Sequence, residues 1–225
     1  MRKICEFFEI TESEFLQPTE QLAASLQSRT YESRTERFHR GLIDELFPRA
    51  EPNLLRYAGY YHSYFFSLGY NGKIIRSLIR IYKSGDKLLS KSIERVSTKD
   101  GEKVGRYITK YRGIVTVAAD RLYVIDKETL WNKAITMTIL YPSYRSHVSR
   151  LTGLTLGSPT IGRNPSCARV LYEYIGDEIN IRHALGACGL FDANDSAIPD
   201  DIRQQVTNSI PASETVFKAL QLVNP

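Results

Sequence analysis

The spacing of hydrophobic and polar residues divides the chain into a helical first part and a β-rich second part. In the first part, apolar residues recur three and four positions apart, as in GLIDELFP at residues 41–48. From Leu54 the period becomes two, and the apolar runs become rich in aromatic residues. We therefore predict a helical segment at residues 1–53 and a β-rich domain at residues 54–225.

The β-rich part indicates a series of strands joined by short connections. ITMTILY, at residues 135–141, alternates apolar and polar residues, as a strand with one buried face requires. GKIIRSLIRIYKSGDKLLSKSIERVS has two apolar runs on either side of residues 84–86, which indicates a hairpin. We count about eight strands between residues 54 and 175. Because closure removes exposed strand edges, we expect an antiparallel meander closed or nearly closed into a barrel, with an open sheet curled over a helix as the alternative.

Two helices are predicted after the strands. The first covers INIRHALGACGLF and the second PDDIRQQVTNSI. Pro199 suits the first helical position of the second helix, and Asp200 and Asp201 suit its first turn, where negative charge is favourable. The predicted fold class is therefore α+β, mainly an antiparallel β meander with helices at the N- and C-termini.

Composition and charge exclude several classes of protein. No apolar run approaches the roughly 18 residues of a membrane span, and no signal peptide is evident. The 3 cysteines have no CxxC spacing and the 4 histidines lie far apart, so we expect a cytoplasmic protein with no metal site and no cofactor. The formal net charge of +5 suits an anionic ligand or nucleic acid.

The sequence has none of the common catalytic motifs. GxSxG, HExxH, the P-loop and a GxGxxG after a strand are all absent. The glycines of GLTLGSPTIGRN could cradle a phosphate, but a flexible connection between two strands is the better interpretation. Cys188 has no histidine placed by sequence to activate it, so we expect a small buried residue. We predict a non-enzymatic protein with no catalytic residues.

Tyrosines and arginines interleave along the predicted strands. A barrel interior is filled by side chains or holds a ligand, and tyrosines with a few arginines would suit a polar or anionic small molecule. Alternatively, these side chains form a solvated outer face, or a platform that stacks unpaired nucleotides. The polar stretch TILYPSYRSHVSRLTGLTLG, which Pro142 interrupts, is a candidate loop for contacts. The predicted ligand-binding residues are Tyr61, Arg80, Tyr111, Tyr144 and Arg145.

The opening stretch RKICEFFEITESEFLQP combines an amphipathic run with a capping box formed by Thr11 and Glu14. It resembles the last two helices of the λ-repressor-like (XRE, or Cro/C1-type) helix-turn-helix domain. In that family a segment of the form L-x-x-I-A-x-x-F-x-V-S-x-x-x-L-L closes the helical bundle. The matching core positions are Ile4, Phe7 or Phe8, Ile10, Thr11, Phe15 and Leu16. The β-rich region also looks like the long C-terminal region found behind such domains in some bacterial regulators.

The resemblance implies the ligand-sensing and dimerisation region of a bacterial transcriptional regulator. The helix that reads bases would lie before residue 1, so DNA would be bound only through a missing N-terminal head. A homodimer is expected because operators of this family are usually palindromic. The alternative is a stand-alone small-molecule-binding β-barrel whose N-terminal helices plug or cap it. Neither interpretation needs a membrane partner.

Overall fold

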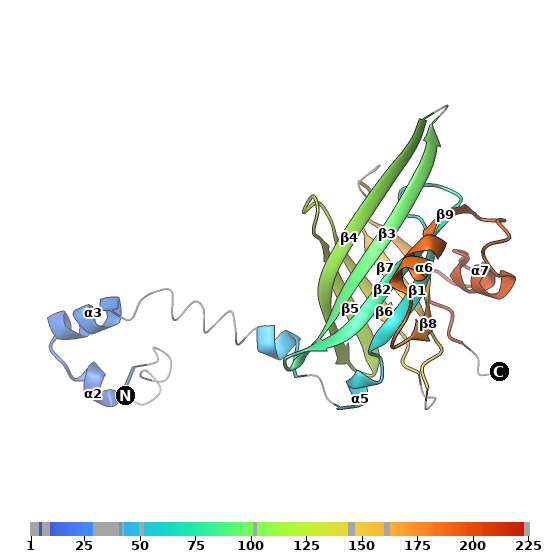
Figure 1. Cartoon of the computed structure of the whole chain (residues 1–225). Helices are drawn as coiled ribbons and strands as arrows, with labels where there is room; N and C mark the ends of the chain where they lie inside the picture. Colours follow the sequence, from blue (N-terminus) through green and yellow to red (C-terminus); the bar gives the residue numbers. More distant parts are fainter. Residues whose placement is uncertain are drawn as a thin grey trace. The chain divides into compact units, whose positions relative to one another are not determined.

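The chain forms two compact units, Met1–Pro48 and Arg49–Pro225, and the division falls just before the boundary predicted at residue 53. Each unit is described by itself. The computed structural model describes residues 5, 10–28, 41, 43–49, 52–100, 103–143, 147–159 and 163–222 (Figure 1).

The first unit contains α2 (Glu12–Phe15) and α3 (Thr19–Ser28). The predicted capping box is confirmed at the start of α2. The Glu14 backbone N–H donates to Thr11 Oγ1 at 3.2 Å, and the Thr11 backbone N–H donates to Glu14 Oε2 at 2.7 Å. These two bonds satisfy backbone donors that the helix itself leaves without partners.

Two described residues before α2 are joined by a backbone hydrogen bond. The Ile10 backbone N–H donates to the Cys5 carbonyl at 3.0 Å, and the Cys5 side chain is buried. Phe15 and Leu16, two of the residues that match the helix-turn-helix pattern, are exposed. The other matched hydrophobic residues, Ile4, Phe7 and Phe8, lie outside the described residues.

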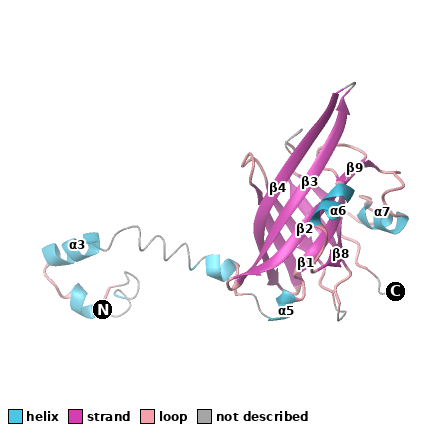
Figure 2. Ribbon diagram, viewed as in Figure 1, coloured by secondary structure: helices cyan, strands magenta, loops and turns pink. Residues whose placement is uncertain are grey.

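The second unit is a closed antiparallel barrel (Figure 2). Each strand pairs with the next along the chain, and β1 pairs with both β2 and β8, which closes the sheet on itself. The predicted α+β fold with a β meander is therefore confirmed, and the alternative of an open sheet is wrong. The eight barrel strands are β1 (Gly59–Phe66), β2 (Lys73–Ser84), β3 (Lys87–Asp100), β4 (Lys103–Ala118), β5 (Arg121–Glu128), β6 (Ile135–Leu140), β7 (Arg150–Gly157) and β8 (Ser166–Gly176).

A short helix precedes the barrel and three further elements follow it. They are α5 (Pro52–Leu55), α6 (Ile181–Ala187), β9 (Gly189–Asp192) and α7 (Asp200–Val206). The prediction of one helix over INIRHALGACGLF is wrong in its second half, because GLFD forms β9. β9 pairs with the part of β2 that β3 leaves unpaired, so it covers a strand edge that would otherwise be bare.

Side-chain alternation sorts the strand residues into an inner and an outer face. Inward residues from all eight strands form one apolar cluster around Tyr61, Leu88 and Leu140. Burying each such large apolar side chain stabilises the fold by about 1.5–3 kcal/mol. Tyr57, before β1, and Val148, before β7, are also buried in this cluster. This cluster therefore fills the α5 end of the barrel.

The outer face of β1, β2 and β8 is covered by the C-terminal elements. Ile198, Ile202 and Val206 pack on Tyr64, Ile74 and Leu171, while Ala184 and Cys188 pack on Leu78. Both faces of these three strands are consequently apolar. No helix in the described part of the chain is long and apolar enough to cross a membrane.

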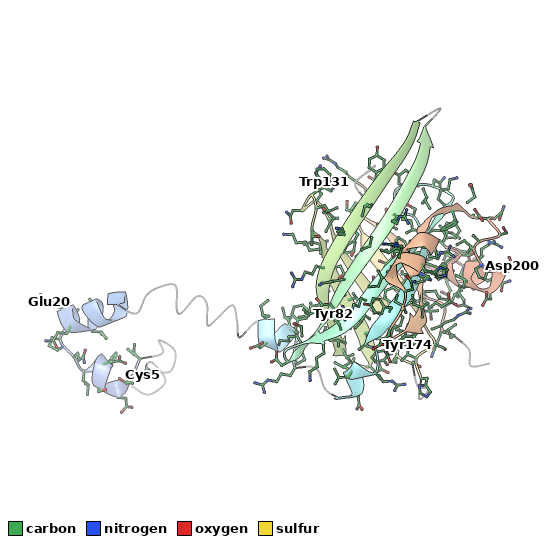
Figure 3. All side chains as sticks on the ribbon, viewed as in Figure 1. Cys5, Glu20, Tyr82, Trp131, Tyr174 and Asp200 are labelled. Carbon is green, nitrogen blue, oxygen red and sulfur yellow. The ribbon has the colours of Figure 1, made fainter. Side chains whose placement is uncertain are left out.

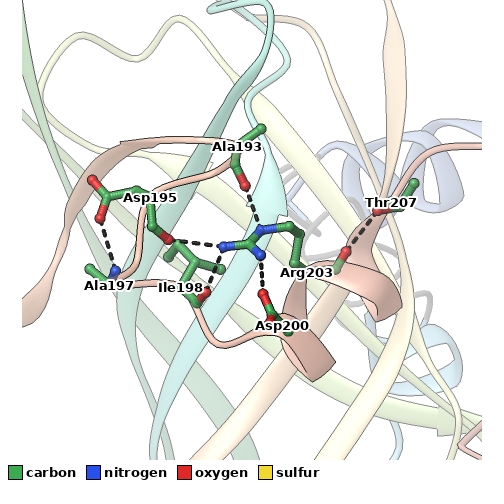
Figure 4. Close-up of polar contacts among 7 residues, drawn as sticks. All are labelled: Ala193, Asp195, Ala197, Ile198, Asp200, Arg203 and Thr207. Carbon is green, nitrogen blue, oxygen red and sulfur yellow. Dashed lines mark hydrogen bonds and ion pairs between the residues drawn. The ribbon is translucent and has the colours of Figure 1, made fainter.

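Arg203 fixes the segment between β9 and α7 (Figure 4). Its guanidinium donates to the carbonyl oxygens of Ala193 at 2.5 Å, Asp195 at 3.0 Å and Ile198 at 2.9 Å, and it pairs with the Asp200 carboxylate. One planar side chain thus satisfies three backbone acceptors, which aligns α7 over the barrel.

β3 and β4 extend past the rest of the barrel as a two-stranded arm (Figure 1). β3 pairs with β2 only from Lys87 to Ile93, and β4 pairs with β5 only from Tyr111 onward. The arm therefore begins at the end of the barrel opposite α5. The candidate site lies at this end of the interior.

Candidate functional site

Ser90, Gly113 and Asp126 lie directly opposite one another on β3, β4 and β5, facing the interior. The Ser90 hydroxyl donates to Asp126 Oδ1 across the glycine. A Cβ atom at Gly113 would lie 2.2 Å from this oxygen and 2.0 Å from the Ile125 carbonyl oxygen. Only glycine at this position leaves room for the Asp126 carboxyl group.

The Asp126 carboxyl group is almost inaccessible, with 6% of the residue exposed. Its burial raises the pKa to about 6, and the hydrogen bond from Ser90 only partly opposes this effect. A carboxyl group held in this way retains its proton to a much higher pH than an aspartate in water.

Glu94 is the second inward carboxyl group, and it lies on β3 where the strand leaves the barrel wall. Burial raises its pKa to about 7, the charge of Asp126 adds to the rise, and a hydrogen bond from the Tyr111 hydroxyl opposes it. Because the two acids interact, they titrate as a pair that holds about one proton between pH 6 and 7.

Two tyrosine hydroxyl groups complete the cluster. Tyr172 shares a hydrogen bond with Thr138, whose hydroxyl donates to Thr155 at 3.0 Å. Burial, with the negative charges of Glu94 and Asp126 adding to it, raises the pKa of both Tyr111 and Tyr172 well above the usual value. Both phenols therefore remain protonated and can donate hydrogen bonds. The interior site consists of Ser90, Glu94, Tyr111, Asp126 and Tyr172.

Glu128, two residues further along β5, has a different role. Its carboxylate accepts backbone N–H groups of Leu130 at 2.5 Å, Trp131 at 2.9 Å and Lys133 at 3.2 Å. Desolvation favours its neutral form, but these backbone bonds outweigh that effect and lower its pKa. Glu128 therefore holds the connection from β5 to β6 as an ionised carboxylate.

The interior site lies at the arm end of the barrel. Glu94 and Tyr111 face inward, yet both are only partly buried. At Glu94, β3 no longer pairs with β2, because the pairing of these strands ends at Ile93. Part of each residue is therefore exposed at this end, although the Glu94 carboxyl group itself is desolvated.

The structure brings two of the predicted ligand residues into the interior. Tyr111 belongs to the interior site. Tyr61 is fully buried in the apolar cluster, where its hydroxyl donates to the Tyr57 carbonyl at 2.8 Å, and burial raises its pKa. Arg80 is exposed on the outer face, with its guanidinium over the rings of Tyr60 and Tyr82. Tyr144 and Arg145 lie outside the described residues.

Sequence reasoning missed the two carboxyl groups and Ser90. The signal was nevertheless present, because Ser90 and Glu94 lie two and six positions from Leu88, on the same side of the strand. Asp126 follows Leu122 and Val124 at the same spacing of two. A polar residue at a position where the alternation expects a core residue is the signature of this site.

Among the residues that the structure describes, no group of three or more His, Cys, Asp or Glu side chains could hold a metal ion. Comparison of the chain with protein-family models, with curated proteins and with solved structures finds no match.

Proposed function

We propose that the protein is a non-enzymatic, small-molecule-binding β-barrel whose ligand occupies the interior site. The observation that supports this proposal is the pair of inward, desolvated carboxyl groups, Glu94 and Asp126, at the arm end of the barrel. Polar groups that converge inside an otherwise apolar interior are the usual arrangement of a small-molecule site.

The ligand carries a positive charge or several hydrogen-bond donors. A cation between Glu94 and Asp126 would compensate the hydration that both carboxyl groups lose, and charge-assisted hydrogen bonds are stronger than neutral ones. The sequence led us to expect a polar or anionic ligand because of the arginines. On the barrel strands, the arginines with described side chains take outward positions. We therefore still propose a polar ligand, but no longer an anionic one.

Binding rather than catalysis is proposed because, among the described residues, no nucleophile paired with a histidine lies at the site. Cys188 lies outside the barrel wall, where its thiol contacts the Ala184 carbonyl at 3.3 Å and burial raises its pKa to about 11. Ser90 donates to the Asp126 carboxyl group, which is a weak base for a serine hydroxyl, and the usual activating base of a serine nucleophile is a histidine. The described histidines His62, His147 and His183 lie on the outer face, in a loop and on α6.

Calorimetry with matched probes tests this proposal. A series of primary amines and the alcohols of the same carbon skeletons would be titrated at pH 6.5 in buffers of different ionisation enthalpy. We expect the amines to bind more tightly and to release protons, because a bound cation ionises the carboxyl pair. Equal affinity for amines and alcohols, or binding without proton release, would contradict the proposal.

Two variants locate the amine site. Asp126→Asn removes the charge but keeps the shape, so it should abolish the preference for amines. Asp86→Asn removes an exposed carboxylate in the turn between β2 and β3 and should leave binding unchanged. If both variants behave alike, the amines bind elsewhere on the surface.

A role as the sensing region of a transcriptional regulator is the second candidate. The observation that favours it is the separate N-terminal unit with its capped helix α2, in the stretch that resembles a helix-turn-helix domain. In this role, ligand binding would favour one arrangement of two subunits in a homodimer. Sedimentation velocity should then show a dimer. A chain that is monomeric with and without the amine probes would contradict the role.

A further inference from the structure

Four basic residues form a row across the outer face of the barrel. Arg80 on β2 lies opposite Lys91 on β3, Lys91 opposite Arg112 on β4, and Arg112 opposite Lys127 on β5. All four residues are exposed. We call this set the basic row.

The charges of β3, β4 and β5 are sorted by face. Glu94, Asp126 and Glu128 take inward positions, whereas further basic residues accompany the row outside: Lys87, Arg95, Lys110 and Arg121. Among the described residues, no carboxylate forms an ion pair with a member of the basic row. Like charges directly opposite each other destabilise a sheet, so an anionic partner would relieve a cost that the free protein bears.

Aromatic residues lie near both ends of the basic row, and two of them, Tyr82 and Trp131, are labelled in Figure 3. The Tyr82 ring centroid lies 5.2 Å from the Arg80 guanidinium carbon and 5.1 Å from Lys91 Nζ, so these cations are held over the surface. At the other end of the row, the connection after β5 contains Trp131, which is 69% exposed. An exposed indole next to a basic surface can stack an unpaired base.

The curvature of the row selects among anionic partners. Its members span three of the eight steps around a closed barrel, so the row turns through about 135°. A flat anionic bilayer would contact only part of such a convex row. Duplex DNA, with a persistence length of about 150 base pairs, is too stiff to follow it. A flexible single strand can place one phosphate after another along the row.

We propose that the outer face of β2 to β5, through Arg80, Lys91, Arg112 and Lys127, binds the phosphate backbone of single-stranded nucleic acid. This contact is independent of sequence, because phosphates position a strand but do not identify its bases. The surface lies on the opposite face of the strands from the interior site, so this proposal does not rest on the ligand proposed above.

A salt titration of oligo-dT binding, followed by fluorescence anisotropy, gives the quantitative test. Each phosphate contact to a single strand contributes about −0.7 to the slope of log K against log salt, so four contacts predict a slope near −2.8. Between about 50 and 200 mM salt the wild-type protein should lose roughly 50-fold in affinity. The double variant R112Q/K127Q should have half this slope and lose only about 7-fold.

The matched control is R163Q/R182Q, which removes the same charge from a loop after β7 and from α6. It should retain the wild-type slope. R80Q/K91Q should repeat the effect of R112Q/K127Q, and far-ultraviolet circular dichroism would show that each variant is folded. The proposal is overturned if control and row variants weaken binding equally, or if duplex DNA binds as tightly as oligo-dT. Row-dependent binding to phosphatidylcholine–phosphatidylserine vesicles without oligo-dT binding would also overturn it.

Discussion

The replacement Asp126→Asn should stabilise the protein at high pH and change little at low pH. In the folded protein the Asp126 carboxyl has a pKa of about 6, raised from 3.8 by burial. Between these values the folded state binds a proton that the unfolded state has released. Stability therefore falls as pH rises through this window, which is the opposite of the behaviour of a salt-bridged aspartate.

The magnitude follows from the two pKa values. A change from 3.8 to about 6 corresponds to about 3 kcal/mol, at roughly 1.4 kcal/mol for each unit of pKa. The raised pKa of Glu94 lowers the stability of the folded protein further as the pH rises to about 7. Because Glu94 and Asp126 interact, their two contributions to the free energy of unfolding are not additive. Asparagine accepts the Ser90 hydrogen bond but cannot ionise, so the variant avoids this cost, which builds up between the two pKa values and is complete above about pH 6.

Urea unfolding at pH 5 and pH 8 measures this effect. We expect Asp126→Asn to be more stable than wild type at pH 8 by up to about 3 kcal/mol, which raises the Tm by roughly 6–12 °C for a chain of this size. At pH 5, which lies between the two pKa values, the difference should be about half as large, roughly 1.6 kcal/mol. Asp86→Asn, an exposed control, should stay within about 0.5 kcal/mol at both pH values. A variant that loses more stability at pH 8 than at pH 5 would show that the carboxylate is stabilised as an ion, and would refute the reasoning.

Three further substitutions test the local geometry. Gly113→Ala should destabilise the barrel by several kcal/mol in urea unfolding, because its Cβ would overlap the Ile125 carbonyl oxygen, and a near-neutral result would contradict this close approach. Arg203→Lys should cost about 2–3 kcal/mol, because one ammonium cannot replace the planar fork that meets three carbonyl groups, and hydrogen exchange should accelerate in α7. Glu128→Gln should cost about 1–3 kcal/mol at pH 7, with the difference disappearing at acidic pH, where wild-type Glu128 is protonated.

Much of the fold was predictable because barrel strands pair with their neighbours along the chain. The turn at residues 84–86 is a local signal, and the β2–β3 hairpin occurs as predicted. The alternation in ITMTIL predicts the strand β6 but not its buried face, because Thr138 and Leu140 are buried whereas Ile135 is exposed. β9 was not predictable in this way. Its pairing with β2 joins residues more than a hundred positions apart, and it depends on β3 leaving the edge of β2 free.

The placement of Arg80 shows why the site was harder to predict than the fold. In β2, Ile79 and Ile81 face the interior, but Ile74 and Leu78 are buried on the outer face beneath the C-terminal elements. With apolar residues on both faces, alternation alone does not decide which side of β2 is the interior. β5 has no such ambiguity, since Leu122 and Val124 define its inner face. Asp126 was missed there because the prediction considered only tyrosines and arginines as polar residues of the interior.

The interior site and the basic row depend on the same feature of β3 and β5, in which Glu94 and Asp126 take inward positions and Lys91 and Lys127 outward ones. Because the side-chain period of a strand is two, a slip of one residue would exchange the faces. In β5 it would bury Lys127 in place of Asp126, and an isolated buried cation is far more costly than a protonated carboxyl group. The charge pattern therefore penalises the wrong register, and Gly113 favours the correct one by accepting the Asp126 side chain. Residues proposed to bind two different partners would thus also fix the register of the strands that present them.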